Sequence, residues 1–206
     1  ITNIAATPNV IAVNPSFPAR DYKTFMTVLK ENPGKYTYSS SGTGGIGHLQ
    51  TELFKSLTGV FIVHIPYRGG GPALIDVMSG EVDVTMLPIS ESMPYVRDGR
   101  VVALGQTGVT RSTIAKDMPT IEEAGVKGYA STTWYMVLGP ANLPANVVSF
   151  MQTQLANVLQ MPELRDKVQA AGVNIINGDS VKAKAFLDAE YKKWAALIKA
   201  SGTVIE

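Results

Sequence analysis

Strand-like and helix-like hydrophobic patterns alternate along the chain up to Leu138. Apolar and β-branched runs predict strands at 9–14, 36–38, 60–65, 82–87, 101–107 and 129–138. Between these runs, apolar residues recur at helical spacing, as at Leu49, Leu53 and Leu57. The alternation predicts an α/β fold with helices on both faces of a parallel or mixed sheet. The continuous run at 60–65 favours a buried strand of the parallel type, and residues 1–7 show no periodicity.

Capping residues predict where several helices begin and end. Asp21 is expected to be the N-cap of a helix, and Gly59 and Gly80 are expected to end two others. Thr120 to Glu123 matches the capping-box pattern and predicts a short helix. Ser180 is expected to cap the last helix of the chain.

The chain beyond Pro140 differs from the rest because it is mainly helical. Helical spacing continues through Val147, Met151, Leu155 and Val158, and Pro162 is expected to begin a further helix. A single short strand is expected at 173–176. Trp194 lies on the apolar stripe of the final helix and is expected in a core. The segment beyond Pro140 supplies only this one strand, so its helices have little sheet within the segment on which to pack.

A polar loop at 39–47 follows one predicted strand and precedes a helix. It consists of serine, threonine and glycine with one isoleucine. A helix N-terminus carries about half a positive elementary charge, so this loop suits a carboxylate or a phosphate. Expected contributors are hydroxyls, backbone N–H groups and the His48 side chain, namely Ser40, Ser41, Gly42, Thr43, Gly44, Gly45, Gly47 and His48. An ordinary turn is the alternative.

Two further loops are expected at the same edge of the sheet, because each directly follows a strand. Tyr67, Arg68 and Gly69 begin one loop, and Leu87 ends the strand before the other. Arg68 is either a bidentate partner for a carboxylate or a solvated charge. Trp134 either lines the ligand cleft or packs in the interior.

Catalytic and metal chemistry find little support in the sequence. The glycine loop lacks the lysine of a phosphate-binding P-loop, and no G-x-S-x-G elbow occurs. His48 is too close in sequence to Ser40 to indicate a dyad, and His64 lies in an apolar run that favours a core position. With two histidines and no cysteine, we expect no metal site and no cofactor. An enzyme acting on an anionic substrate remains the alternative.

Composition and charge argue against two kinds of partner, nucleic acid and the membrane interior. The net charge is +1 without a basic stripe, which argues against a nucleic-acid partner. No apolar stretch of about 18 residues is present, so we expect a protein that is not embedded in a membrane. No signal-peptide pattern is found, and the absence of cysteine leaves the compartment open.

Several motifs together resemble one family. They are NPGKYTYSSSGTGGIGHLQTELF at 32–54, VHIPYRGGGPAL at 63–74, GEVDV at 80–84 and MPTIEEAG at 118–125. In order and spacing the chain resembles the substrate-binding proteins of tripartite tricarboxylate transporters, the Bug family of periplasmic solute receptors. The resemblance implies a type II periplasmic-binding-protein fold whose two lobes clamp a small organic acid. It also implies a periplasmic location, delivery of the solute to membrane permease subunits, and no catalysis.

The resemblance also predicts how the chain is divided. Residues 8–139 would form the second, ligand-binding lobe, with crossing strands at 9–14 and 129–138, and 140–206 would belong to the first lobe. Family members extend further at the N-terminus, so the first lobe's opening strands are expected to be missing here, and pairing with another chain, such as a homodimer, is one explanation. Leu87 and Pro88 stand where relatives often carry an acidic and a polar residue, which favours ligands without an amino group.

Overall fold

One buried strand runs through the middle of the larger sheet. In the computed structural model, which describes residues 1–204, all five residues of β2 (Asn9–Val13) are buried. The larger sheet has the strand order β4-β3-β5-β2-β6, with β3 (Thr37–Ser40), β4 (Val63–Pro66), β5 (Val84–Pro88) and β6 (Val102–Gln106). Strands β4, β3 and β5 are mutually parallel, whereas β2 is antiparallel to β5 and β6. The sheet is therefore mixed.

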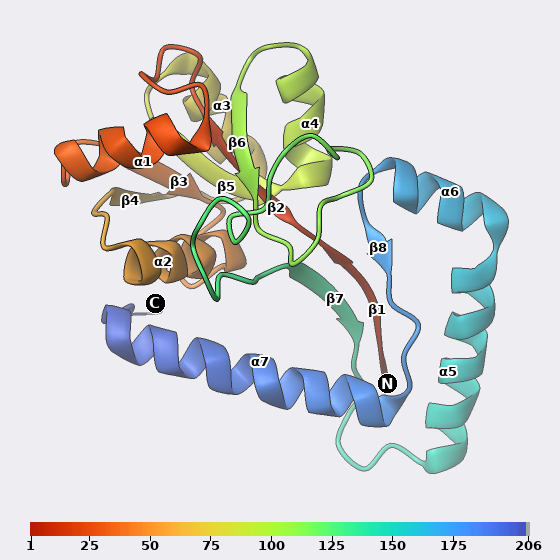
Figure 1. The fold of residues 1–206 in the computed structure, drawn as a ribbon. Helices are drawn as coiled ribbons and strands as arrows, with labels where there is room; N and C mark the ends of the chain where they lie inside the picture. The colour runs from red at the N-terminus through yellow and green to blue at the C-terminus, as the bar shows by residue number, and fades with distance from the viewer. Residues whose placement is uncertain (205–206) are drawn as a thin grey trace.

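Helices cover both faces of this sheet, as the alternating side chains of β2 require. Ile11 and Val13 pack into a cluster with α1 (Tyr22–Glu31) and α2 (Ile46–Thr58). Val10 and Ala12 pack into a second cluster with α3 (Gly70–Ser79) and α4 (Ile89–Arg97). Figure 1 shows these helices around the upper sheet. The α/β prediction is confirmed.

A smaller sheet has the order β7-β1-β8, with β1 (Thr2–Thr7), β7 (Thr133–Val137) and β8 (Asn174–Ile175). Both neighbours run antiparallel to β1. Only Pro8 separates β1 from β2, so the chain passes directly from the smaller sheet to the larger one (Figure 1). Thr133 Oγ1 donates a hydrogen bond of 2.8 Å to Asn9 Oδ1 and so links β7 to the connection between β1 and β2.

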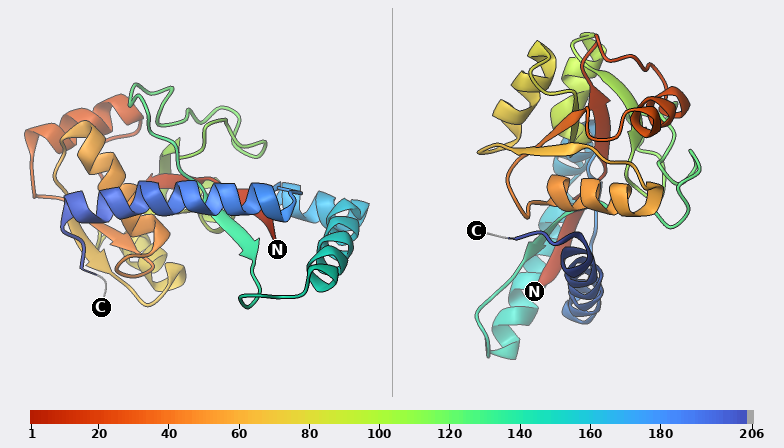
Figure 2. Two further views of the ribbon diagram at one scale, coloured as in Figure 1. Left: turned by 90° about the horizontal axis from the view of Figure 1, so that it is seen from below. Right: turned by 90° about the vertical axis from the view of Figure 1, so that its left-hand side faces the viewer.

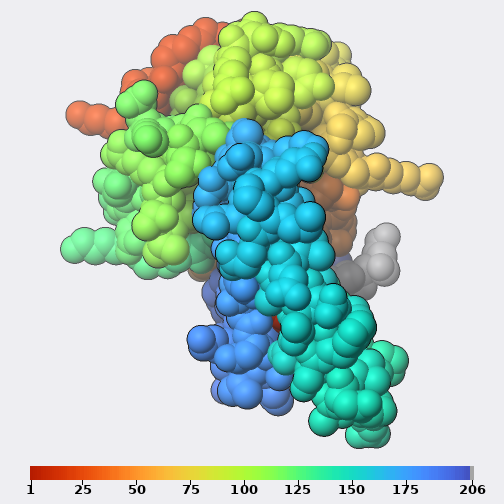
Figure 3. All heavy atoms as spheres, turned by 90° about the vertical axis from the view of Figure 1, so that its right-hand side faces the viewer, coloured from red at the N-terminus to blue at the C-terminus, as the bar shows by residue number. Residues whose placement is uncertain are grey.

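The last three helices are α5 (Ala145–Gln160), α6 (Pro162–Ala170) and α7 (Ser180–Ser201). Helix α7 extends from the smaller sheet to the underside of the larger part of the molecule (Figures 1 and 2). There Trp194 and Leu197 pack against Leu49 of α2, so Trp194 is buried as expected. Helices α5 and α6 form a column that projects from the body of the molecule (Figure 3).

Local signals predicted most helix ends correctly. Asp21 is the N-cap of α1, accepting a hydrogen bond from the Thr24 N–H, and Gly59 and Gly80 end α2 and α3 in the left-handed region. The capping hydrogen bonds between Thr120 and Glu123 form, although the following residues make a turn rather than a helix.

Three further expectations about elements were wrong. Residues 2–7 form β1 although no element was expected there. Strand β4 begins only at Val63 and lies at the edge of the sheet, so it is partly exposed rather than buried. Asp179, not Ser180, caps α7, because its carboxylate accepts the N–H of Lys182.

Candidate functional site

Two polar loops and the start of α4 meet at one edge of the larger sheet, and the expected third loop does not form because Ile89 begins α4 directly after Pro88 ends β5. They follow β3, β4 and β5, whose parallel arrangement puts their carboxyl ends together. The Tyr67 N–H donates to the Ser40 carbonyl at 3.0 Å, and the Gly69 N–H donates to the Ser41 carbonyl at 3.3 Å. The loops after β3 and β4 are thus hydrogen-bonded to each other.

The glycine loop between β3 and α2 requires glycine for conformation and for space. Gly42 and Gly44 have φ values of 142° and 75°, in the region that L side chains rarely adopt. A Cβ on Gly47 would lie 2.6 Å from the Met86 carbonyl oxygen. The start of α2 therefore lies directly against the backbone of β5.

Several groups expected to bind a ligand also make hydrogen bonds within the loop. Ser40 is 0% exposed, and its Oγ accepts the Gly42 N–H at 3.2 Å. The Gly44 N–H donates to His48 Nδ1 at 3.0 Å, and the Gly45 N–H donates to the Gly42 carbonyl at 3.1 Å. These residues lie in the loop as predicted, but their polar groups are already paired.

The remaining donors lie at the mouth of the loop. Ser41 and Thr43 are exposed, and their hydroxyls make no hydrogen bond within residues 1–204. The backbone N–H groups of Ile46, Gly47 and His48, in the first turn of α2, also have no partner within the described chain. Two hydroxyls and a helix N-terminus therefore remain available for an anion.

Two histidines stack beneath this loop. The rings of His48 and His64 are parallel within 7°, with centroids 3.9 Å apart. His64 Nε2 lies 2.7 Å from Ser40 Oγ, and its ring also stacks on Tyr38 at 4.8 Å. Burial lowers the pKa of both imidazoles, that of His64 to about 4, and His48 also opposes a positive charge on His64. His64 was expected in the core, and its contact with Ser40 depends on strand pairing that the sequence did not reveal.

The charges next to the histidines compensate one another. Glu52 Oε1 accepts hydrogen bonds from Tyr38 Oη at 2.8 Å and from Lys55 Nζ at 2.7 Å. His48 Nε2 is 3.8 Å from the same oxygen. Burial, followed by the charge of Glu52, raises the pKa of Tyr38 far above its usual range. The loop thus rests on a layer with little net charge.

The second loop contributes one anchored and one exposed side chain. Tyr67 Oη donates to Asp76 Oδ2 at 2.6 Å, and partial burial together with this bond raises the pKa of Tyr67 to about 12. Arg68 is exposed and makes no ion pair or hydrogen bond within residues 1–204. Gly69 has a φ of 114° and directly precedes α3.

Leu87 lies beneath the second loop, in the cluster on which Tyr67 packs, whereas Trp134 packs against α7. Leu87 is 1% exposed and packs among the side chains between the sheet, α3 and α4. Trp134 Nε1 donates to Glu190 Oε2 at 3.1 Å, and the Trp134 ring meets Phe186 edge-on. Trp134 therefore faces α7.

An acidic residue that was not expected in the site lies beside the second loop. A Cβ on Gly70 would approach Glu91 Oε2 to 2.4 Å, so this carboxylate lies against the start of α3. Partial burial raises the pKa of Glu91. Burial and, secondarily, the charge of Glu91 raise the pKa of Tyr135 in β7. The sequence signal was its position four residues after Leu87, in a segment expected to be a polar loop that instead forms the first turn of α4.

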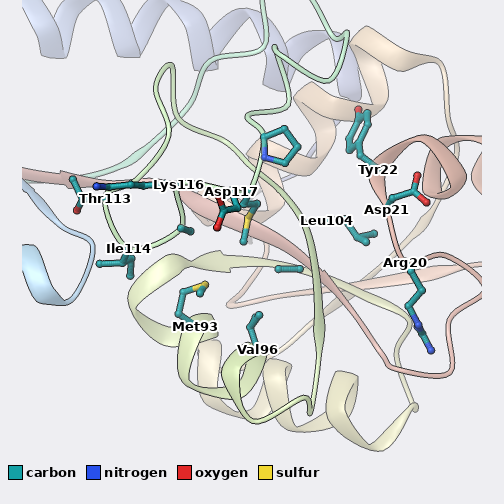
Figure 4. A pocket seen from close by; sticks show the side chains of 14 residues that line it. Arg20, Asp21, Tyr22, Met93, Val96, Leu104, Thr113, Ile114, Lys116 and Asp117 are labelled. Carbon is teal, nitrogen blue, oxygen red and sulfur yellow. The ribbon is translucent and has the colours of Figure 1, made fainter.

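Two larger hollows lie away from the glycine loop. A cavity of about 610 Å³ is bounded by the start of α1, by α4 and by the segment 113–119; Figure 4 shows Arg20, Asp21, Lys116 and Asp117 around it. An apolar groove of about 510 Å³ lies along α7, lined by Trp134, Leu187, Tyr191, Trp194 and Ile198, among others. Within residues 1–204 no group of three or more histidine, aspartate or glutamate side chains is arranged to hold a metal ion. None of the helices described there has the length and apolar character of a transmembrane span.

The sequence model of the tripartite tricarboxylate transporter family receptor matches residues 1–203. The chain belongs to this family. A protein encoded between tcbD and tcbE in Pseudomonas sp. strain P51 is 30% identical over 197 residues, which are 95% of this chain and 59% of that protein. Protein BugT of Bordetella pertussis is 24% identical over the whole chain and 63% of its own length. The chain thus spans about three fifths of the length of these relatives.

Solved structures of the family share the fold. The adipate-bound R. palustris protein Rpa4515 is 32% identical with a TM-score of 0.89, over 97% of this chain and 67% of its own. A periplasmic transporter is 35% identical with a TM-score of 0.91, over 100% of this chain and 69% of its own. The periplasmic binding protein BugD is 25% identical with a TM-score of 0.87, over 98% of this chain and 68% of its own. The expected solute-receptor fold is confirmed.

Proposed function

We propose that this protein is a solute receptor that binds a small organic acid at the glycine loop. The observation that carries the proposal is the convergence of the Ser41 and Thr43 hydroxyls with the free N–H groups in the first turn of α2. All of these groups donate hydrogen bonds, and the helix end favours negative charge. A carboxylate matches this arrangement of donors. The adipate-bound relative supports the same class of ligand.

The neighbouring residues at this edge of the sheet would bind the part of the ligand that lies beyond its first carboxylate. Arg68 is exposed in the adjacent loop and is a candidate cation for a second carboxylate. Glu91 lies next to Gly70 and offers a partner for an ammonium group. A binding panel should therefore compare dicarboxylates with amino acids, and we expect dicarboxylates to bind more tightly because Arg68 carries no competing partner within residues 1–204.

We further propose the division of the molecule that the family resemblance implies. Residues 8–139 would be the ligand-binding lobe and 140–206 a part of the other lobe. Closure of the two lobes would bend the chain at Pro8 and before β7, where it connects the two sheets. The receptor would act outside the cytoplasm and hand its solute to membrane permease subunits, without catalysis.

Calorimetric titration with adipate tests the proposal, alongside a diamide of the same length as an uncharged control. Thr43→Val removes one exposed hydroxyl and should weaken adipate binding about tenfold, because a hydrogen bond to a charged group contributes about 1.5–3 kcal/mol. Thr153→Val, on the exposed face of α5, is the matched control and should bind as the wild type does. Equal binding of the acid and the diamide would contradict the proposal.

An enzyme is the second candidate, because Ser40 Oγ and His64 Nε2 are in hydrogen-bond contact at 2.7 Å. Such a pair can activate a serine nucleophile. The complete burial of Ser40 and its acceptance of the Gly42 N–H argue against this role. Turnover of a bound carboxylic ester, abolished by Ser40→Ala, would establish the enzyme; an unchanged ligand after prolonged incubation is the expected result.

Association with another chain is a third candidate, and the apolar groove on α7 is the observation that favours it. Exposed apolar area of this kind often marks a contact surface. Light scattering would give the molar mass in solution. A dimer that binds no carboxylate would favour association as the main role.

A further inference from the structure

The stacked pair His48 and His64 connects the glycine loop to the sheet. His48 Nδ1 accepts the N–H of Gly44, which lies in the loop itself. His64 Nε2 contacts Ser40 Oγ, whose oxygen also accepts the Gly42 N–H. Each imidazole thus holds one side of the loop whose mouth carries the proposed carboxylate site.

Both contacts depend on the protonation state of the rings. Because Nδ1 of His48 accepts a hydrogen bond, the ring proton of neutral His48 must be on Nε2. Ser40 Oγ has one proton, which it can donate to His64 Nε2 or to the Gly42 carbonyl at 3.1 Å. A neutral His64 can accept that proton, which completes the network around Ser40.

We propose that His48 and His64 are positioning residues that keep the glycine loop in its ligand-binding shape only while both imidazoles are neutral, so that acid weakens carboxylate binding. This inference rests on the proposed function of the loop. Neither histidine needs to touch the ligand, because each acts through the loop backbone or through Ser40.

Protonation would disrupt the loop through His48 and through the stacked ring pair. A proton on His48 Nδ1 would face the Gly44 N–H, so two donors would meet at 3.0 Å. A protonated His64 can only donate to Ser40 Oγ, which keeps a lone pair for the Gly42 N–H and directs its own proton to the Gly42 carbonyl, so the charge on this ring acts on the loop through its stacked neighbour. Two positive rings with centroids 3.9 Å apart would also repel each other.

The surrounding charged and titratable groups do not offset these effects. Tyr38 stacks on His64 from β3, and Glu52 and Lys55 face the pair from α2. Glu52 favours a charge on His48, but it already accepts hydrogen bonds from Tyr38 Oη and Lys55 Nζ, and Lys55 opposes the charge. The lowered pKa of both rings is consistent with a pair that stays neutral near pH 7.

The sign of the pH effect distinguishes this role from a direct contact. A histidine that touched the carboxylate would gain charge on acidification and would strengthen binding. Positioning histidines predict the opposite result, because the loop loses its shape as they become charged.

The first test needs no ligand, since the chain contains only two histidines and their ring signals are readily assigned by NMR. We expect the amide signals of Gly42, Gly44 and Gly47 to shift with the same midpoint as the imidazoles, below the ordinary histidine pKa of 6.5. Imidazoles that titrate without any shift of these amides would overturn the inference. A protein that binds no carboxylate would refute the proposed function but leave this result intact.

The second test compares adipate affinity of the wild type with that of His64→Gln, whose amide oxygen can accept a hydrogen bond but does not titrate. We expect the wild type to bind about tenfold more tightly at a pH of about 7.5 and to lose this advantage as the pH falls toward about 4. Ionisation of adipate itself affects both proteins equally and cancels in the ratio. An advantage that stays constant or grows on acidification would overturn the inference.

Discussion

At the scale of single residues, the site depends on Gly47 because this residue has no Cβ. The start of α2 lies so close to β5 that a Cβ would be 2.6 Å from a backbone oxygen, which cannot move without distorting the strand. Gly47→Ala should therefore lower the free energy of unfolding by about 1–3 kcal/mol, as measured by chemical denaturation. Gly71→Ala, with nothing within 4 Å of the added Cβ, is the control. It should remain within about 1 kcal/mol of the wild type, and equal losses in both variants would contradict this account.

His64 should also make stability depend on pH. Its folded-state pKa of about 4 lies below the ordinary value of 6.5, so between these values the unfolded chain binds more protons. Stability contributed by the neutral ring is complete above pH 6.5 and falls as the pH drops toward 4. The slope for one histidine is at most about 1.4 kcal/mol per pH unit. Thermal unfolding of His64→Gln should show a shallower slope over this window; an identical slope would contradict the assignment.

Most local residue signals were read correctly, whereas long-range pairings were not predicted. Asp21 and Gly59 act within one helical turn, so their roles follow from neighbouring residues. The contact between Ser40 and His64 requires β3 and β4 to pair with Tyr38 opposite His64, which short-range patterns cannot specify. For the same reason, the sequence predicted which residues form the loop but not which of their polar groups remain free.

At the scale of elements, Asn9 joins three strands where the chain passes between the sheets. Its side chain donates to the Met86 carbonyl of β5 at 3.2 Å and accepts from Thr133 Oγ1 of β7 at 2.8 Å. Because Asn9 is completely buried, Asn9→Ala would leave both partners unpaired and should cost about 1–3 kcal/mol in denaturation experiments. Asn146→Ala, at an exposed position in α5, should cost little. A loss no larger than that of this control would argue against the role of Asn9.

The two strands that were predicted wrongly, β1 and β4, have a physical reason in common. β1 contains small and polar residues that are nevertheless buried, such as Thr2 and Asn3, so no hydrophobic alternation marks it. β4 has an apolar sequence but lies at a sheet edge, where Val63 remains exposed. Both outcomes depend on the place of a strand in the sheet rather than on its own residues.

At the scale of the whole molecule, α7 joins the part built on the smaller sheet to the part built on the larger one. Leu197 and Trp194 of α7 pack on Leu49 of α2. Leu197→Ala should destabilise the protein by about 2–4 kcal/mol and leave one cooperative unfolding transition in calorimetry. Val181→Ala, exposed in the same helix, should have little effect. Two separate transitions in the wild type would show that α7 does not couple the two parts.

The general architecture was accessible from the sequence because alternating strands and helices leave few arrangements of a sheet. The position of each polar loop directly after a strand predicted a common edge, and the parallel pairing of β3 and β4 brings the loops after these strands together. The cavity beside Arg20 and Asp117 was not foreseen, since it forms between segments far apart in the chain.

The central claim is that a carboxylate binds at the mouth of the glycine loop. Chemical-shift mapping by NMR during titration with adipate tests it most directly. We predict the largest shifts at the amides of Ser41, Thr43, Ile46 and Gly47, with Thr43→Val weakening the response. Shifts confined to the cavity in Figure 4 or to the apolar groove on α7 would contradict the claim.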